Sequence, residues 1–68
     1  VELIDEPEPY CFAVFTLHGP YVSHIGVVLE DTRYFIHILA HRNVAKERLD
    51  HRFWKQKLVG LYRWKHKL

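Results

Sequence analysis

The strongest constraint on the fold of this chain is the stretch SHIGVVLEDTRYFIH, in which two β-prone runs flank a short polar turn. Ser23–Leu29 is rich in β-branched residues, Tyr34–Ile38 supplies a second run, and Glu30–Arg33 between them is polar and short. Runs of this kind around a polar turn are typical of a β-hairpin. The sequence therefore predicts a hairpin that carries one histidine on each arm, His24 and His37.

The register of this hairpin decides how close the two histidines come. A two-residue turn at Glu30-Asp31 sets His24 directly opposite His37, whereas a four-residue loop sets His37 opposite Gly26. Because side chains alternate between the two faces of a strand, both registers leave the histidines on one face. Only an odd-length loop or a bulge would part them. The hairpin thus predicts a site built on His24 and His37, beside Gly26.

Length and composition indicate one small folded domain. The chain has 68 residues, of which 49% are hydrophobic and 15% aromatic, and these shares exclude a disordered chain. No run approaches the roughly 20 apolar residues that a membrane-spanning helix needs. The lone cysteine, Cys11, excludes an internal disulfide and a cysteine-based zinc cage. We expect Cys11 to be a small buried core residue.

The expected fold class is mainly β (of the α+β family), a small antiparallel sheet of four or five strands with at most one short helix. Residues 1–9 contain two prolines and four acids, which predicts a linker or an extended lead-in segment. Residues 10–68 are expected to form a single β-rich domain. Tyr10–Thr16 is its first strand, apolar enough to be covered on both faces, and Lys57–Trp64 is its last.

The section Asn43–Gln56 has two interpretations. Its apolar residues have roughly helical spacing, with Asn43 as a possible N-cap. The alternative is a short strand at Asn43–Lys46 followed by a helical turn near Leu49–Lys55. Periodicity alone does not decide between them.

Charge is distributed unevenly along the chain, although the net charge is only +2. Residues 1–9 hold four acidic residues and no basic one, whereas residues 41–68 hold nine lysines and arginines against two acids. Such a gradient can mark a surface for an anionic polymer, but a solvated basic face is the favoured interpretation. Nucleic acid is not expected as a partner, although the aromatic side chains among these basic residues could stack on nucleotides. Phe53, Trp54 and Trp64 are also the expected core of so small a domain.

The six histidines invite a metal site, but their spacing does not support one. His37 and His41 are four apart, which is ligand spacing only on a helix, and Phe35–Ile38 is expected to be a strand. No third ligand is indicated beside His24 and His37, so no metal or other cofactor is expected. The remaining histidines, His18, His51 and His66, are expected to be solvated.

Each arm of the hairpin carries a short motif: His24-Ile25-Gly26-Val27-Val28 on the first and Phe35-Ile36-His37 on the second. The predicted strand at Tyr10–Thr16 precedes these motifs, and a longer pattern of residues follows them. That pattern runs Val44, Glu47-Arg48-Leu49, Trp54, Val59-Gly60 and Tyr62-Arg63. Over about residues 8–64 this arrangement resembles the histidine segment of the NlpC/p-sixty family of cell-wall cysteine peptidases, in particular its phage tail-associated members. These papain-like enzymes cleave peptide bonds in bacterial peptidoglycan. Pro9-Tyr10-Cys11 departs from the Pro-Gly-Asp that normally opens the preceding strand.

By that resemblance, His24 matches the general base that activates a cysteine, and His37 matches the polar residue that orients the base. An imidazole that takes the thiol proton creates a good nucleophile, and a partner on its other nitrogen fixes its tautomer. The family's nucleophilic cysteine opens a helix some tens of residues before these strands. Residues 1–9 do not match that helix, and Cys11 aligns with a non-catalytic position.

The resemblance therefore implies the histidine-bearing β-half of a papain-like peptidase, inactive unless another segment or chain supplies the cysteine. It also implies a peptidoglycan peptide or another cell-wall polymer as partner, and a phage tail or bacterial envelope as location. The alternatives are a non-catalytic structural or binding module of such a protein and, more weakly, a small nucleic-acid-binding β-domain. A sheet without its covering helix exposes apolar surface or unpaired edges, so we expect a homo-oligomer or a partner that supplies the helix.

Overall fold

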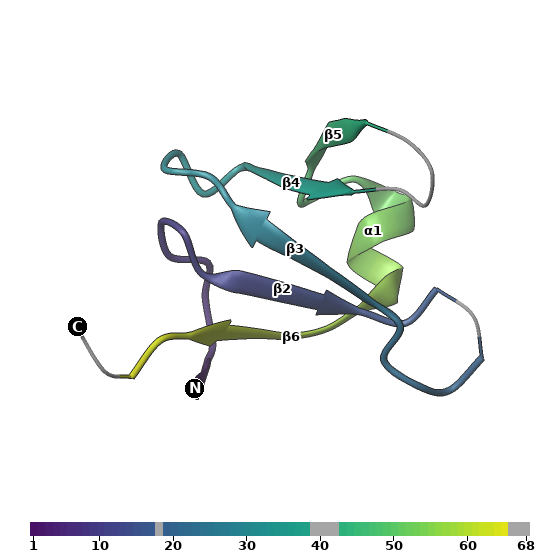
Figure 1. Ribbon diagram of the computed structural model, residues 1–68, viewed down its shortest axis with the longest axis horizontal. Helices are drawn as coiled ribbons and strands as arrows, with labels where there is room; N and C mark the ends of the chain where they lie inside the picture. The colour runs from purple at the N-terminus through teal and green to yellow at the C-terminus, as the bar shows by residue number, and fades with distance from the viewer. Residues whose placement is uncertain (18, 39–42, 66–68) are drawn as a thin grey trace.

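One six-stranded antiparallel sheet and one short helix make up the fold. The computed structural model describes residues 1–17, 19–38 and 43–65. In chain order the elements are β1 (Glu2–Ile4), β2 (Phe12–Phe15), β3 (His24–Val28), β4 (Tyr34–Ile38), β5 (Val44–Arg48), α1 (Arg52–Lys57) and β6 (Leu58–Arg63). The strands lie in the order β1-β6-β2-β3-β4-β5, with α1 against one face (Figure 1). The expected fold class is confirmed, with six strands where four or five were expected.

The sixth strand comes from the segment that was expected to be a linker or a lead-in. β1 pairs with β6 at the far edge of the sheet, so that Glu2 lies opposite Arg63. The Arg63 guanidinium holds this edge, since Nε donates to Glu2 at 2.6 Å and a terminal nitrogen donates to Glu8 at 2.9 Å. The acidic start of the chain therefore neutralises part of its basic end.

Residues 43–56 follow the second of the two interpretations, a strand and then a helical turn. β5 extends two residues beyond the expected strand, and α1 contains six residues. The prediction of Asn43 as an N-cap is wrong, because His51 caps α1 by accepting a hydrogen bond at Nδ1 from the Phe53 amide at 3.2 Å. Within the described ranges this short helix is far from the length of a membrane span.

The core lies between α1 and the sheet face that we call the helix face. Alternate residues of the central strands point there, and Trp54 of α1 packs against Phe15 and Phe35 at centroid distances of 5.2 and 5.3 Å. The buried hydrophobic residues are Cys11, Ala13, Phe15, Val28, Phe35, Leu49, Trp54 and Leu61. Trp54 is thus a core residue, as expected. The same expectation is wrong for Phe53 and Trp64, which are 47% and 67% exposed.

The opposite side of the sheet, the open face, is mostly apolar apart from Lys46 and Arg48 of β5, and no described element packs across it. Phe12 and Val14 of β2 are only half-buried there, while Ile25 of β3 and Ile38 of β4 are 59% and 67% exposed. The expectation that the first strand is covered on both faces is therefore wrong. Covering both faces would need a second layer, and the described residues supply only α1.

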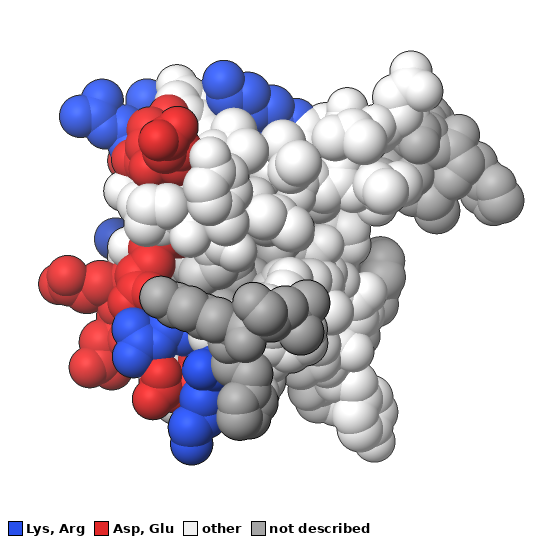
Figure 2. Space-filling model, turned by 60° about the vertical axis from the view of Figure 1, so that its left-hand side comes forward, with Lys and Arg blue, Asp and Glu red and all other residues white. Residues whose placement is uncertain are grey.

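In the view of Figure 2, charged side chains gather along the left and upper edges of the molecule. Figure 2 shows acidic and basic groups interspersed there, whereas the rest of the visible surface carries neither among the described residues. Arg48 contributes a further ion pair with Asp50, at 2.9 Å. Two basic residues of the C-terminal half, Arg48 and Arg63, are thus paired with acidic side chains.

Candidate functional site

A four-residue loop sets the register of the β3–β4 hairpin. Leu29 closes the loop by donating its amide to the Tyr34 carbonyl at 2.8 Å, and Val27 pairs with Ile36. Inside the loop the Asp31 carboxylate accepts the Arg33 amide at 2.9 Å, an Asx turn of the kind that favours aspartate. The four-residue alternative is therefore confirmed and the two-residue turn is wrong.

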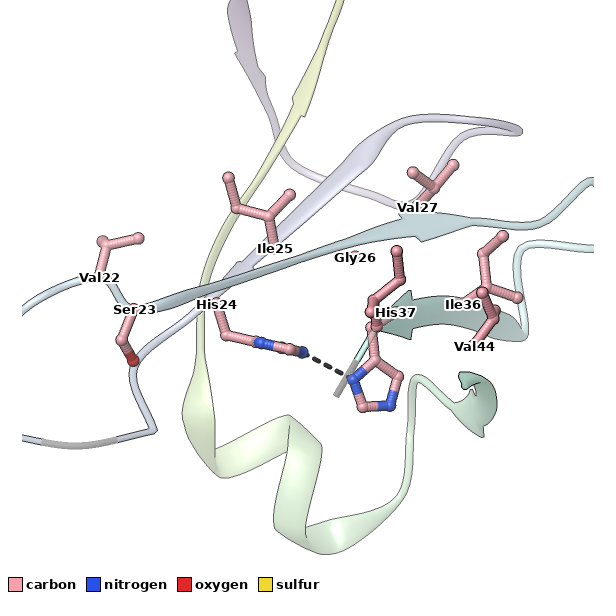
Figure 3. Close-up of a pocket in the computed structure, with 10 residues that line it drawn as sticks. Val22, Ser23, His24, Ile25, Gly26, Val27, Ile36, His37 and Val44 are labelled. Carbon is pink, nitrogen blue, oxygen red and sulfur yellow. Dashed lines mark hydrogen bonds between the residues drawn. The ribbon is translucent and has the colours of Figure 1, made fainter. Parts of the chain in front are cut away.

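This register brings the two predicted histidines together on the helix face. His24 Nε2 and His37 Nδ1 lie 2.6 Å apart, within hydrogen-bond distance, and the rings are nearly perpendicular at 89° (Figure 3). His37 is 3% exposed, whereas His24 is half-buried. The predicted shared face of His24 and His37 is confirmed. In the neutral pair, one ring N–H donates to the bare nitrogen of the other ring.

A pocket opens beside the pair because β3 and β4 diverge toward the histidines (Figure 1). The strands are in register at Val27–Ile36 and Val28–Phe35, and they separate beyond these positions. The resulting pocket has a volume of about 600 Å³. Its lining is apolar apart from three polar residues and comprises Val22, Ser23, His24, Ile25, Gly26, Val27, Ile36, His37, Ile38 and Val44. The histidine rings lie on the α1 side of the strands, whereas Val22, Ile25 and Val27 point to the opposite side (Figure 3).

Gly26 allows the two arms to approach each other at the edge of this pocket. A Cβ at this position would lie 2.7 Å from Cδ2 of Phe35 and 3.0 Å from the Ile36 carbonyl oxygen. Only glycine lets the Phe35 ring lie so close to the β3 backbone. The predicted place of Gly26 beside the two histidines thus has a physical reason, namely the close packing of the Phe35 ring against the β3 backbone.

Aromatic rings enclose the histidine pair on the helix face. Trp54 stacks on His24 at 6.0 Å and meets His37 edge-on at 4.9 Å, measured between ring centroids. Burial among these rings, followed by repulsion from His37, lowers the pKa of His24 below its usual value. A lowered pKa keeps the His24 imidazole neutral at neutral pH, which is the state a general base needs.

A third polar side chain reaches the pair from β5, and sequence reasoning did not identify it. Glu47 Oε2 lies 3.5 Å from His37 Nε2, on the side of the ring that faces away from His24. The signal that could have found Glu47 is the period-two alternation of a strand at residues 44–48. That signal was ambiguous because the same residues also fit a helix.

Cys11 lies far from the histidine pair. The Cys11 carbonyl accepts the Val28 amide at 2.8 Å, whereas the residue opposite His24 on β2 is Phe15. Four residues along a strand amount to roughly 13 Å. The Cys11 side chain is also buried, which confirms the expected core role. Cys11 is therefore not placed to exchange a proton with His24.

The other histidines do not join the site as far as the structure describes them. His51 caps α1 and is exposed. His18, His41 and His66 lie outside the described residues. The expected solvation of His18 and His66, and the spacing between His37 and His41, therefore stay predictions. In residues 1–17, 19–38 and 43–65, no three His, Cys, Asp or Glu side chains are arranged so that they could hold one metal ion.

No protein-family model matches this chain, and a search of curated proteins gave no match. The resemblance to the NlpC/p-sixty family therefore remains a prediction from the hairpin residues.

Proposed function

We propose that this chain is the base-bearing part of a cysteine peptidase of the NlpC/p-sixty type, which hydrolyses amide bonds in peptidoglycan peptides. The observation that carries the proposal is the 2.6 Å contact between His24 Nε2 and His37 Nδ1. A base that activates a thiol needs one nitrogen engaged by an orienting partner and the other available to take a proton. His24 meets both conditions in the tautomer with its proton on Nε2, which then contacts His37 and leaves Nδ1 bare.

In this proposal the nucleophilic cysteine comes from another segment or another chain and reaches His24 through the pocket between β3 and β4. The thiol proton passes to His24 Nδ1, and the thiolate attacks the amide carbonyl to form a thioester. His24 then returns the proton to the leaving amine, and water hydrolyses the thioester. His37 holds the His24 ring and its tautomer throughout.

The test is the release of peptide fragments from purified peptidoglycan by the gene product together with whatever sequence flanks these residues. We expect His24→Ala and His37→Asn to lower kcat by about 100-fold or more, the usual contribution of a general base. His51→Ala is the matched control, because His51 is exposed and caps α1. Equal activity of the His24→Ala protein and the unmodified protein would overturn the proposal.

The isolated 68-residue chain is expected to be inactive in the same assay, because its one thiol is buried away from the base. Hydrolysis by this chain that Cys11→Ser abolishes would contradict that expectation directly.

A second candidate function is that of a non-catalytic binding module, which the open face favours. A second pocket, lined by Val1, Phe12, Val14, Val22, Ile25, Tyr62 and Trp64, shares Val22 and Ile25 with the pocket beside the histidines. Sedimentation with intact peptidoglycan separates the two functions. A binding module loses its affinity in Ile25→Lys and keeps it in His24→Ala, and it shows no hydrolysis in either form.

A further inference from the structure

His24, His37 and Glu47 form a row of polar side chains across three neighbouring strands of the helix face. His24 is on β3, His37 on β4 and Glu47 on β5. The contacts are 2.6 Å between His24 Nε2 and His37 Nδ1, and 3.5 Å between His37 Nε2 and Glu47 Oε2. The two nitrogens of His37 thus face two different partners.

The unsatisfied atom in this row is His37 Nε2. The His37 side chain is fully buried, and among the described residues Nε2 has no hydrogen-bond partner. A buried polar atom without a hydrogen-bond partner lowers the free energy of unfolding. The Glu47 carboxylate is the acceptor that lies near His37 Nε2. The Glu47 side chain is 37% exposed and so has room to rotate and shorten the 3.5 Å contact.

The charged neighbours of Glu47 on β5 do not compete for it. Lys46 packs over the Tyr34 ring at 4.6 Å, and Arg48 forms its ion pair with Asp50 at 2.9 Å. Alternation along β5 also directs Lys46 and Arg48 away from the helix face.

We propose that Glu47 is a positioning residue that fixes the tautomers of both histidines. A carboxylate can only accept, so His37 must carry its proton on Nε2 to donate to Glu47. A neutral His37 then presents a bare Nδ1, and His24 must donate to it from Nε2. The bare nitrogen of His24 is consequently Nδ1.

Without Glu47 the direction of the hydrogen bond between His24 and His37 can reverse. His37 Nδ1 then carries the proton and donates to His24 Nε2, which leaves His24 protonated on Nδ1 and unable to accept a proton there. The catalytic consequence, that Glu47 keeps His24 competent as a base, rests on the proposed function. The tautomer assignment does not, because it needs only the contact between the two histidines and a hydrogen bond from His37 Nε2 to Glu47 once the 3.5 Å contact shortens.

Long-range proton–nitrogen correlation spectra of the histidine rings test the assignment, since the ring nitrogen shifts report which nitrogen carries the proton. The sample is the ¹⁵N-labelled 68-residue chain at a pH where the pair is neutral. We expect both His24 and His37 in the Nε2–H form. A spectrum with His37 protonated on Nδ1 overturns the inference without any variant.

Three variants sharpen the test. In Glu47→Leu we expect His24 to shift toward the Nδ1–H form, whereas Glu47→Gln retains the Nε2–H form because the amide oxygen still accepts. Glu30→Leu, an exposed glutamate in the hairpin loop, is the matched control and leaves both tautomers unchanged. Unchanged tautomers in Glu47→Leu contradict the inference.

Hydrolysis assays separate this inference from the proposed function. If the gene product hydrolyses peptidoglycan through His24 with equal activity in Glu47→Leu, then the role of Glu47 fails alone. If no hydrolysis occurs but the tautomers respond to Glu47, then the proposed function fails and the tautomer assignment stands.

Discussion

The imidazole of His24 combines two properties at the residue scale: it is half-buried among aromatic rings, and one of its nitrogens is engaged by His37. The sequence predicted the shared face of His24 and His37, because strand alternation survives any even-length loop. It did not predict the contact to Glu47. That contact depends on where β5 begins, and a helical interpretation of the same residues places Glu47 elsewhere.

The lowered pKa of His24 predicts a pH dependence of stability with a definite sign. Burial, then repulsion from His37, disfavours the protonated form in the folded state, so the unfolded chain binds the proton more readily. The free energy of unfolding is therefore highest above about pH 6.5 and falls on acidification through the lowered pKa of His24. Urea denaturation at a series of pH values measures this, and His24→Gln flattens the profile. An increase in stability on acidification below neutrality contradicts it.

Gly26→Ala is predicted to destabilise the fold. The added methyl group collides with Phe35 and with backbone, and overpacking of this kind lowers the free energy of unfolding by about 1–3 kcal/mol. Gly60→Ala is the matched control in β6, because its nearest contacts are the side chains of Leu3 and Tyr62, both at 3.3 Å, and none of its three nearest atoms belongs to the backbone. Denaturant titration of both variants gives the comparison, and a larger loss for Gly60→Ala would contradict this account of the hairpin.

At the scale of elements, the hairpin was predictable because its pattern is local, whereas β1 and the β5–α1 segment were not. β1 is held by Arg63, 61 residues away, and no local composition reports such a contact. Residues 43–56 divide into a five-residue strand and a six-residue helix, each too short for its period to dominate. The exposure of Phe53 and Trp64 was missed because hydrophobicity alone does not say which side of an element faces the core.

The element that covers the histidines is α1, and Trp54 is its anchor. We predict that Trp54→Ala lowers the free energy of unfolding by about 3–5 kcal/mol, because the residue fills the space between Phe15, Phe35 and the two histidines. Phe53→Ala, at the adjacent exposed position, is expected to cost less than about 1 kcal/mol. Thermal denaturation followed by circular dichroism distinguishes them, and similar losses for the two variants would mean that α1 does not anchor the core.

At the scale of the whole molecule, residues 1–17, 19–38 and 43–65 cover the sheet on one face only, with α1. Its open face carries exposed hydrophobic residues from the β1 edge to the β5 edge, including Leu3, Ile25, Ile38, Val44 and Trp64. Exposed hydrophobic residues that form a large patch mark an interaction site in small proteins. The sequence predicted exposed apolar surface or edges for want of a covering helix, whereas α1 covers one face through Trp54 and the exposed hydrophobic residues lie on the other face.

We predict that a second copy of the chain covers the open face, so that the protein self-associates. Light scattering over a range of concentrations measures this, and Ile25→Lys is expected to shift the population toward monomer. Phe53→Lys is the control, because Phe53 is also an exposed hydrophobic residue, at 47% against 59% for Ile25, but belongs to α1 on the opposite side of the sheet. A strictly monomeric protein at every concentration would count against this prediction.

The central claim is that His24 and His37 act as one coupled base, and the titration of His24 by NMR tests it most directly. We predict that the pKa of His24 lies below the usual value of about 6.5 and rises in His37→Asn, which removes the repulsion between the two rings, but not in His51→Asn. A His24 that titrates at about 6.5 in all three proteins would contradict the claim, because the two histidines would then be independent neighbours.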